Sequence, residues 1–250
     1  MLLRTLAPCL CALAAIAAGA AQAGAGTADS AGTGSDTVVV TGIRDPALLP
    51  YRRGYEFTTK IRAASGGHVR LKLRALSKKS REPIPDLHVH IIGSRDYGEI
   101  AISQAGYFEV PLIDAALHDN ADFVTNQKKG SMRIDATLNP VLPAGDLRYS
   151  DIQQSIAGAR HAIAAILPWY LRMWLPTVKG VGICYRQPGA TVDVETADGT
   201  VERAADKKET DEEGVKLLCA RFSASEWSLQ ADSKLMPDPG YEAIFTGSWL

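Results

Sequence analysis

The chain has 250 residues, a formal net charge of -1 at pH 7 and a hydrophobic content of 46%. These values are those of an ordinary globular protein, long enough for one large or two small domains with a buried core. After residue 23, no apolar stretch reaches the roughly 20 residues that a membrane-spanning helix needs. We therefore expect no transmembrane segment in the mature chain, which should be soluble or peripheral.

The first 23 residues have the pattern of a secretory signal peptide. Arg4 is their only charge, an apolar run follows it, and the small residues Ala21 and Ala23 fit cleavage after Ala23. This pattern predicts Sec-type export and a periplasmic or secreted mature protein. Residues 24–36 are rich in Gly, Ala, Ser and Thr, a composition that predicts a disordered leader.

Cysteine usage agrees with export. Cys9 and Cys11 leave with the signal peptide, so the mature chain keeps only Cys184 and Cys219. In an oxidising compartment this pair predicts one disulfide, which would close a loop of about 35 residues and stabilise the fold by about 3 kcal/mol. The alternative is a pair of reduced, buried cysteines.

Residues 37–42, Thr-Val-Val-Val-Thr-Gly, follow the leader and resemble the TonB box of outer-membrane TonB-dependent receptors. Such a segment works by adding a strand to the sheet edge of a partner protein. The alternative is a plain first strand of the fold. A receptor itself is excluded, because the rest of the chain is too short for a plug and a large barrel.

Alternating apolar and polar residues from Tyr55 onwards predict short antiparallel strands and a sandwich-like domain over residues 37–143. The strand at 68–75 has the clearest alternation. One of its faces is apolar and the other basic, with Val69, Leu71, Leu73 and Ala75 opposite His68, Arg70, Lys72 and Arg74. Further strands are expected at 87–91, 99–103 and 107–112, with a turn at 104–106.

Two segments of this domain carry a family resemblance. Residues 82–89, Glu-Pro-Ile-Pro-Asp-Leu-His-Val, and 102–108, Ile-Ser-Gln-Ala-Gly-Tyr-Phe, resemble carboxypeptidase-regulatory-like and transthyretin-like β-sandwich modules. The resemblance covers residues 68–138, and Asp86 and Leu87 stand where those modules have a glycine. It implies a non-catalytic accessory module that binds or spaces, and it transfers no active-site residues.

Residues 144–250 are expected to form a second β-rich region, separated from the first by one amphipathic helix at about 150–167. Ser150 and Gln153 have the spacing of a capping box, and Pro168 ends the helix. The apolar stripe of this helix is Ile152, Ile156, Ala159, Ile163 and Ile166. The chain as a whole is therefore predicted to be mainly β.

The rest of the second region is read as strands and loops. Strands are expected at 181–185, 192–195, 201–203, 215–222 and 241–249, with a hairpin turn at Asp198-Gly199. The charge run from Lys207 to Gly214 is expected to be a solvated loop. The aromatic segment 169–176 is expected either to pack as a short helix between the two regions or to anchor at a membrane interface or an apolar partner.

His88-Val89-His90 is the one candidate for metal chemistry. Residues two apart on a strand project to the same side, so two imidazoles could face one ion, as a similar His-Xaa-His motif does in amidohydrolases. A complete site needs third and fourth ligands, and the sequence offers no HExxH motif, no Cys/His cluster and no nucleophile elbow. The alternative is a pair of solvent-facing histidines, and we expect no cofactor.

The charge distribution is more informative than any motif. Residues 52–81 contain ten bases and one acid, a net charge of +9, whereas residues 190–214 contain nine acids and three bases, a net charge of -6. Either the two segments face each other or are simply solvated, or the basic strand face of Arg70, Lys72 and Arg74 meets an anionic component of the cell envelope.

These observations favour an exported, non-catalytic binding or envelope-assembly module. Its expected partner is an envelope protein or an anionic glycolipid or glycan rather than nucleic acid. The alternative is a small periplasmic metal-binding protein or metal-dependent hydrolase that uses His88 and His90.

Overall fold

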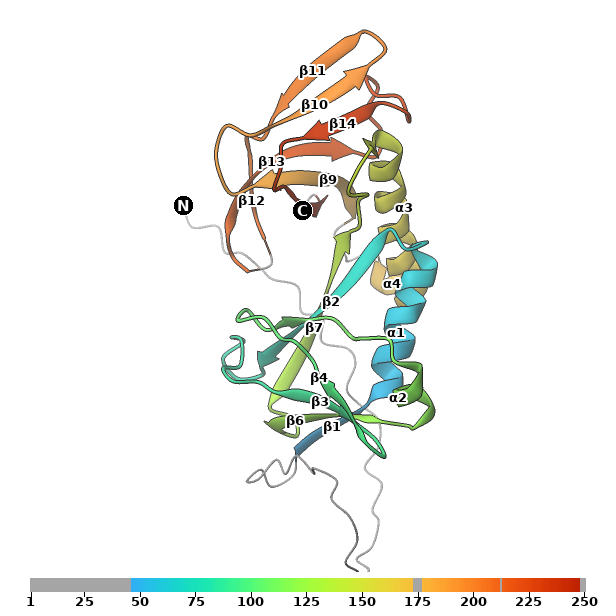
Figure 1. Ribbon diagram of the computed structural model, residues 1–250, viewed down its shortest axis with the longest axis vertical. Helices are drawn as coiled ribbons and strands as arrows, with labels where there is room; N and C mark the ends of the chain where they lie inside the picture. The colour runs from blue at the N-terminus through green and yellow to red at the C-terminus, as the bar shows by residue number, and fades with distance from the viewer. Residues whose placement is uncertain (1–45, 173–176, 212, 248–250) are drawn as a thin grey trace, which may run out of the picture. The chain divides into compact units, whose positions relative to one another are not determined.

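The computed structural model describes residues 46–172, 177–211 and 213–247 (Figure 1). Residues Ile43–Leu250 form one compact unit, and Met1–Gly42 form a second unit of which no residue is described. The predicted signal peptide, leader and TonB-box-like segment therefore lie outside the described residues. Within the described part of the chain, no helix is both long and apolar enough to cross a membrane.

The described chain is mainly β, as predicted, and every strand pair is antiparallel. We call residues 46–140 the N-terminal region. Its elements are β1 (Pro46–Pro50), α1 (Tyr51–Ala64), β2 (Val69–Ser77), β3 (Val89–Ile92), β4 (Asp96–Glu99), β5 (Tyr107–Phe108), α2 (Asp114–His118), β6 (Asp122–Lys128) and β7 (Met132–Pro140).

We call residues 147–247 the C-terminal region. Its elements are β8 (Leu147–Arg148), α3 (Tyr149–Ile166), α4 (Trp169–Arg172), β9 (Val178–Tyr185), β10 (Thr191–Thr196), β11 (Gly199–Ala204), β12 (Lys207–Thr210), β13 (Lys216–Ser223), β14 (Lys234–Pro237) and β15 (Glu242–Gly247). The boundary expected near residue 143 falls in the connection between the two regions, and its status as a domain boundary stays a prediction.

Two small sheets make up the N-terminal region, with strand orders β1-β6-β3-β4 and β5-β2-β7. The strand predicted at 68–75 is confirmed as β2, in which Val69, Leu71 and Ala75 are buried and Arg70 is exposed. The core of this region joins side chains of both sheets to α1 and α2, including Tyr51, Ala75, Ile91 and Ala116.

The strand alternation expected from Tyr55 onwards is wrong for the residues up to Ala64, which belong to helix α1. Residues Tyr51–Ala64 are helical, and Ile61 is only 1% exposed. Phe57 and Ile61 are four residues apart, so they lie on the same face of the helix, where they pack with Leu71 and Ala162. Threonines and aromatics in this segment favour a strand locally, but burial against β2 and α3 outweighs that weak preference.

The strand edges in the middle of the N-terminal region also differ from expectation. The strand expected at 99–103 ends at Glu99, and the one expected at 107–112 is only the two residues of β5. The turn at 104–106 is confirmed. It needs a glycine, because Gly106 has φ +84° and a Cβ there would lie 2.6 Å from the backbone oxygen of Ala75.

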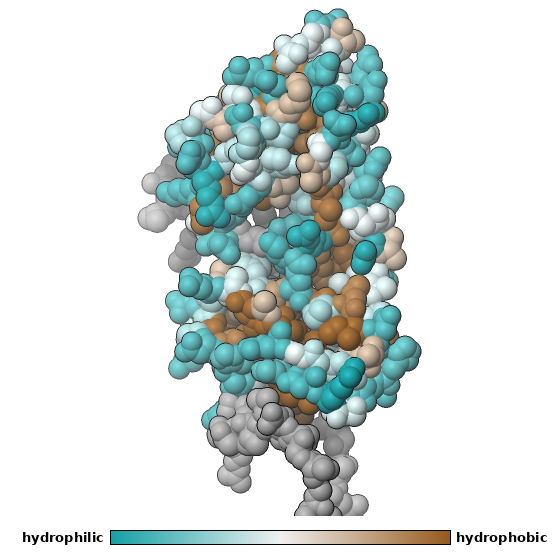
Figure 2. Space-filling model, viewed as in Figure 1, coloured by the Kyte–Doolittle hydropathy of each residue, from teal (hydrophilic) through white to brown (hydrophobic). Residues whose placement is uncertain are grey.

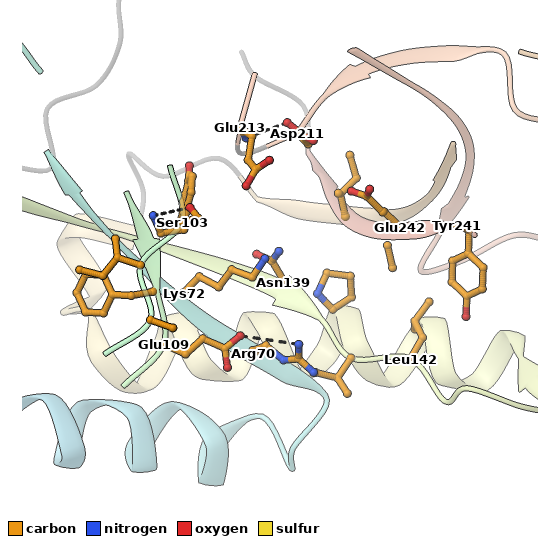
Figure 3. Close-up of a pocket in the computed structure, with 18 of the residues that line it drawn as sticks. Arg70, Lys72, Ser103, Glu109, Asn139, Leu142, Asp211, Glu213, Tyr241 and Glu242 are labelled. Carbon is orange, nitrogen blue, oxygen red and sulfur yellow. Dashed lines mark hydrogen bonds and ion pairs between the residues drawn. The ribbon is translucent and has the colours of Figure 1, made fainter. Parts of the chain in front are cut away.

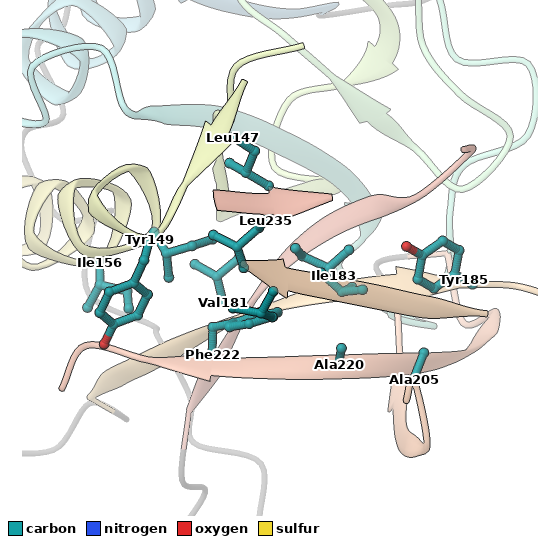
Figure 4. Close-up of a cluster of buried hydrophobic side chains, with 13 residues drawn as sticks. Leu147, Tyr149, Ile156, Val181, Ile183, Tyr185, Ala205, Ala220, Phe222 and Leu235 are labelled. Atoms are coloured by element: carbon teal, nitrogen blue, oxygen red, sulfur yellow. The ribbon is translucent and has the colours of Figure 1, made fainter. Parts of the chain in front are cut away.

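The C-terminal region consists of two sheets with strand orders β11-β10-β14-β8 and β12-β13-β9-β15. Figure 4 shows their shared core, in which Val181, Ile183, Phe222 and Leu235 meet Tyr149 and Ile156 of α3. The predicted hairpin is confirmed, but its two-residue turn is Ala197-Asp198, one position before the expected Asp198-Gly199, because Thr196 pairs with Gly199. Strands β9, β13 and β15 confirm the predictions for 181–185, 215–222 and most of 241–249.

Cys184 and Cys219 are cross-strand partners on β9 and β13 and lie at disulfide-bonding distance, as predicted. Both side chains are fully buried, together with Leu217. Their cluster lies on the face of β9 opposite Ile183. The bridge therefore ties two neighbouring strands on the side away from the main core.

Helix α3 confirms the predicted helix, with Ile152, Ile156 and Ala159 fully buried. Its start differs in detail. The helix begins at Tyr149, and the Asp151 carboxylate accepts a hydrogen bond of 2.8 Å from the backbone N–H of Arg148. Gln153 was expected to complete a capping box with Ser150, but its side chain instead donates to the carbonyl of Ala224 at 3.2 Å.

The charge run was expected to be a loop, and its first half is a strand. Lys207–Thr210 form β12, which pairs with β13 at the edge of its sheet. Glu209 faces Arg221 of β13 in an ion pair, whereas Lys207 and Lys208 are exposed. After β12 the chain turns at Asp211. The carboxylate of Asp211 accepts a hydrogen bond of 2.8 Å from the backbone N–H of Glu213.

The aromatic segment 169–176 begins with the short helix α4, and residues 173–176 lie outside the described part of the chain. Tyr170 is 52% exposed. The choice between an inter-region packing role and an interface anchor stays a prediction.

Candidate functional site

A cleft of about 1100 Å³ lies within the compact unit and is lined by residues of both regions (Figure 3). One wall comes from β2, β7 and the segment that runs from Glu99 to Pro111. The other comes from β15, Arg186 and the turn at Asp211 and Glu213. The cleft joins apolar and charged side chains, and concave surfaces of this kind are the default sites of ligand binding.

The apolar part of the cleft comes from both walls. Ile100, Ile102 and Phe108 contribute from the N-terminal region, and Leu142 and Ile244 contribute from farther along the chain. On the face shown in Figure 2, hydrophobic residues come to the surface in the N-terminal region, whereas the C-terminal region is mostly hydrophilic there. A ligand in the cleft would therefore bury apolar as well as charged surface.

Two of the three predicted basic residues line this cleft. Arg70 and Lys72 project from β2 into it, and Arg70 lies 3.8 Å from the carboxylate of Glu109. The Arg70 and Glu109 side chains are 56% and 51% exposed, so water screens their attraction and the pair is weak. Arg70 therefore remains open to a ligand anion.

Arg74 has a structural role that the alternation did not reveal. Its Nε donates to the carbonyl of Ala105 at 2.9 Å, and its guanidinium lies 4.9 Å from the centre of the Tyr107 ring. These contacts hold the turn at 104–106 against β2. Arg74 is absent from the cleft lining, so the expected stripe of three bases divides into two cleft residues and one turn clamp.

The acidic segment contributes to the same cleft, which the sequence raised only as one alternative. Asp211 and Glu213 belong to residues 190–214, and both line the wall opposite Arg70 and Lys72. The charged side chains of the cleft are Arg70, Lys72 and Arg186 together with Glu99, Glu109, Asp211, Glu213 and Glu242. The cleft is thus of mixed charge, with carboxylates in excess.

Asn139 is a cleft residue that sequence reasoning missed. It lies opposite Arg70 in the pairing of β2 with β7, so the two side chains project from the same face. Its Oδ1 is buried and has no hydrogen-bond partner among the described residues. An unpaired buried acceptor costs about 1–3 kcal/mol, so a polar residue at this position needs a reason other than stability. A polar residue one position before the end of β7 is the only sequence signal.

Tyr241 contributes a neutral hydroxyl to the cleft. Burial raises the pKa of its phenol above the ordinary value of 10.0. The side chain therefore stays protonated throughout the neutral range and can both donate and accept a hydrogen bond there.

The two predicted histidines meet two carboxylates. His88 Nδ1 lies 2.5 Å from Glu99 Oε1, and His90 Nδ1 lies 3.1 Å from Asp96 Oδ2. His90 Nε2 also approaches the second oxygen of Glu99 at 3.9 Å. As the side chains are placed, no group of three or more His, Cys, Asp or Glu among the described residues could hold a metal ion. The carboxylates come from β4, which pairs with β3 across a short turn.

Comparison with protein-family models, with curated proteins and with solved structures gave no match for this chain. The resemblance of residues 68–138 to carboxypeptidase-regulatory-like and transthyretin-like modules therefore stays a prediction. The geometry of the cleft and of the histidine cluster is what bears on function.

Proposed function

We propose that this chain is an exported, non-catalytic binding module that takes an envelope component into the cleft between β2, β7 and β15. The unpaired Oδ1 of Asn139, beside Arg70 on the cleft face, is the observation that carries the proposal. A ligand that donates a hydrogen bond to this atom would turn a cost of the free protein into binding energy.

The charges of the cleft restrict the chemistry of the ligand. Arg70 and Lys72 favour an anionic group such as a phosphate or carboxylate, whereas Asn139 and the opposing carboxylates favour N–H donors. A pure polyanion would be repelled by Glu109, Glu213 and Glu242. The ligand that fits is an anionic glycan or glycolipid that also carries amide or amine groups, lying along the cleft with its apolar parts against Ile100 and Ile102.

Binding to lipopolysaccharide-containing vesicles tests the proposal. The double variant Arg70→Gln/Lys72→Gln should weaken retention about tenfold or more, because hydrogen bonds to charged groups contribute about 1.5–3 kcal/mol each. Added salt should weaken the wild type in the same direction. The matched control is Lys207→Gln/Lys208→Gln, which removes the same charge from exposed positions outside the cleft lining. Equal losses in both double variants would reduce the effect to net charge and refute the cleft.

Asn139→Leu separates function from folding. Removing the side chain whose Oδ1 is unpaired should leave the free energy of unfolding unchanged or raise it by about 1 kcal/mol, and should weaken ligand retention. Urea unfolding and vesicle retention, measured on the same preparation, check the two effects. A variant that loses stability but keeps retention would show that Asn139 serves the fold and not a ligand.

A further inference from the structure

We infer that His88, His90 and Glu99 form a binding site for one divalent transition-metal ion, with Asp96 as the positioning residue for His90. The site is independent of the ligand proposed for the cleft, although the Glu99 side chain lies at the edge of both.

The fold brings the three ligand groups to one place. His90 and Glu99 are directly paired across β3 and β4, and His88 precedes His90 by two positions, which places it on the same side of the chain. The Glu99 carboxylate consequently lies between the two imidazoles. One of its oxygens contacts His88 Nδ1 at 2.5 Å, and the other faces His90 Nε2 at 3.9 Å.

These separations are close to those of a metal centre. Ligand atoms that lie about 2.0–2.1 Å from a tetrahedral ion are about 3.3 Å from one another. The distances of 2.5 and 3.9 Å from Glu99 to His88 and His90 bracket that value. Without the ion, the acid and the imidazole satisfy each other by a hydrogen bond. The Glu99 and His88 side chains are exposed, and a shift of their ligand atoms by less than about 1 Å would open the position for a cation.

His90 already has the outer contact that metal-binding histidines usually have. Its Nδ1 faces Asp96 Oδ2 at 3.1 Å, and the other oxygen of Asp96 accepts the backbone N–H of Gly98 at 2.8 Å. A carboxylate fixed in this way holds the proton on Nδ1 and leaves the Nε2 lone pair toward Glu99. The ion would displace the proton shared by His88 Nδ1 and Glu99, which moves to His88 Nε2 or to solvent.

Exposure and ligand type indicate the class of ion. The His90 side chain is 18% exposed, whereas those of Glu99 and His88 are 46% and 59% exposed, so the site is anchored on one side and open on the other. Two imidazoles and one carboxylate suit Zn²⁺, Cu²⁺ or Ni²⁺ rather than Ca²⁺ or Mg²⁺, and a water would complete the coordination.

Calorimetric titration of the metal-free, full mature protein with Zn²⁺, and in parallel with Cu²⁺, tests the site. We expect one ion per chain, and a rise in thermal stability as the ion is added. His88→Ala and His90→Ala should abolish this binding, and Asp96→Asn should weaken it by about 10- to 100-fold. The matched controls His118→Ala and His161→Ala remove imidazoles elsewhere in the chain and should bind as the wild type does.

Two outcomes overturn the metal site itself. If neither Zn²⁺ nor Cu²⁺ shows saturable binding, the site is refuted. If His88→Ala and His90→Ala bind the ion as the wild type does, these ligands are refuted. Because His88 is mostly exposed, circular dichroism of His88→Ala should match the wild type. If His90→Ala alone misfolds, His88→Ala still decides, and full affinity in Asp96→Asn would remove the positioning role.

Discussion

The two regions are both built from a pair of small antiparallel sheets, yet they use their strands differently. In the C-terminal region, every residue from Gly180 to Tyr185 of β9 is buried, because one face of the strand meets the main core and the other meets the disulfide cluster. In the N-terminal region, β3 and the first half of β2 alternate buried with more exposed residues, and Arg70, Lys72 and His90 lie at the more exposed positions. Both proposed sites lie on these strands. The comparison indicates that the C-terminal region supplies stability and that the N-terminal region carries most of the chemistry.

Truncating one buried phenylalanine in each region should show the difference between the regions most strongly. Phe222→Ala empties a fully buried position in the C-terminal core and should lower the free energy of unfolding by about 3–5 kcal/mol. Phe108→Ala, at a position that is 9% exposed beside the cleft, should cost less because water and neighbouring side chains can fill the space. Urea unfolding of both variants checks this order, and a larger loss for Phe108→Ala would contradict it.

Removing the disulfide should act on the C-terminal region only. Cys184→Ala/Cys219→Ala opens a link between residues 35 apart in sequence and should cost about 2–4 kcal/mol. The mature wild-type protein, denatured without reductant, should show no free thiol. Hydrogen exchange should accelerate in β9 and β13 more than in β2 and β7. Two titratable thiols per chain in the wild type would refute the bridge.

A bulky side chain at the helix crossing tests how the two regions depend on each other. Gly158 of α3 is buried against the end of α1, where an added Cβ would lie 2.8 Å from the backbone oxygen of Ser65. Gly158→Val must push the helices apart and should cost about 1–3 kcal/mol. Two separate unfolding transitions in this variant would show that each region folds alone. The control Gly145→Ala adds a Cβ in open space and should be neutral.

Because of Tyr185, the free energy of unfolding of the C-terminal region should fall as the pH becomes alkaline. Burial, and after it the Asp238 carboxylate, raise the pKa of its phenol from 10.0 to about 12. Because the folded pKa is the higher one, the contribution is complete below pH 10 and disappears as the pH rises through about 12. Unfolding measured between pH 9 and 12 should show this loss in the wild type and less of it in Tyr185→Phe. An identical pH profile in both would contradict the assignment.

The smallest effect is expected at the edge of the C-terminal sheet. Lys208 lies exposed on β12, so Lys208→Glu should change the free energy of unfolding by less than about 0.5 kcal/mol. Glu209→Lys is the matched comparison, because it would face Arg221 and should cost more. Equal costs in thermal unfolding would mean that the pairing of β12 with β13 does not orient these charges.

Alternation and turn chemistry were sufficient for the elements that depend on local pattern. They predicted β2, β9, α3 and the hairpin of β10 and β11, because each has one uninterrupted period and a matching stop signal. Helix α1 was missed because its residues carry a mixed signal that only the packing of Ile61 against β2 and α3 resolves. Strand β12 was missed because a run of charged residues indicates only that a segment is exposed to solvent. An edge strand can be exposed and still be paired.

For the sites, the two-residue period of a strand is enough to predict which residue types share a face. Arg70 and Lys72 on β2, and His88 and His90 around β3, follow from this period. What lies opposite these residues depends on the tertiary structure. The tertiary structure assigned Arg74 to a turn and brought Asp211 and Glu213 across the cleft from Arg70. It also left the Oδ1 of Asn139 without a hydrogen-bond partner among the described residues, and placed Glu99 and Asp96 beside the histidines. The reason is physical: side-chain direction is a local property of the backbone, whereas the partner of a side chain depends on which strands pair and which sheets pack, and these contacts join residues far apart in the chain.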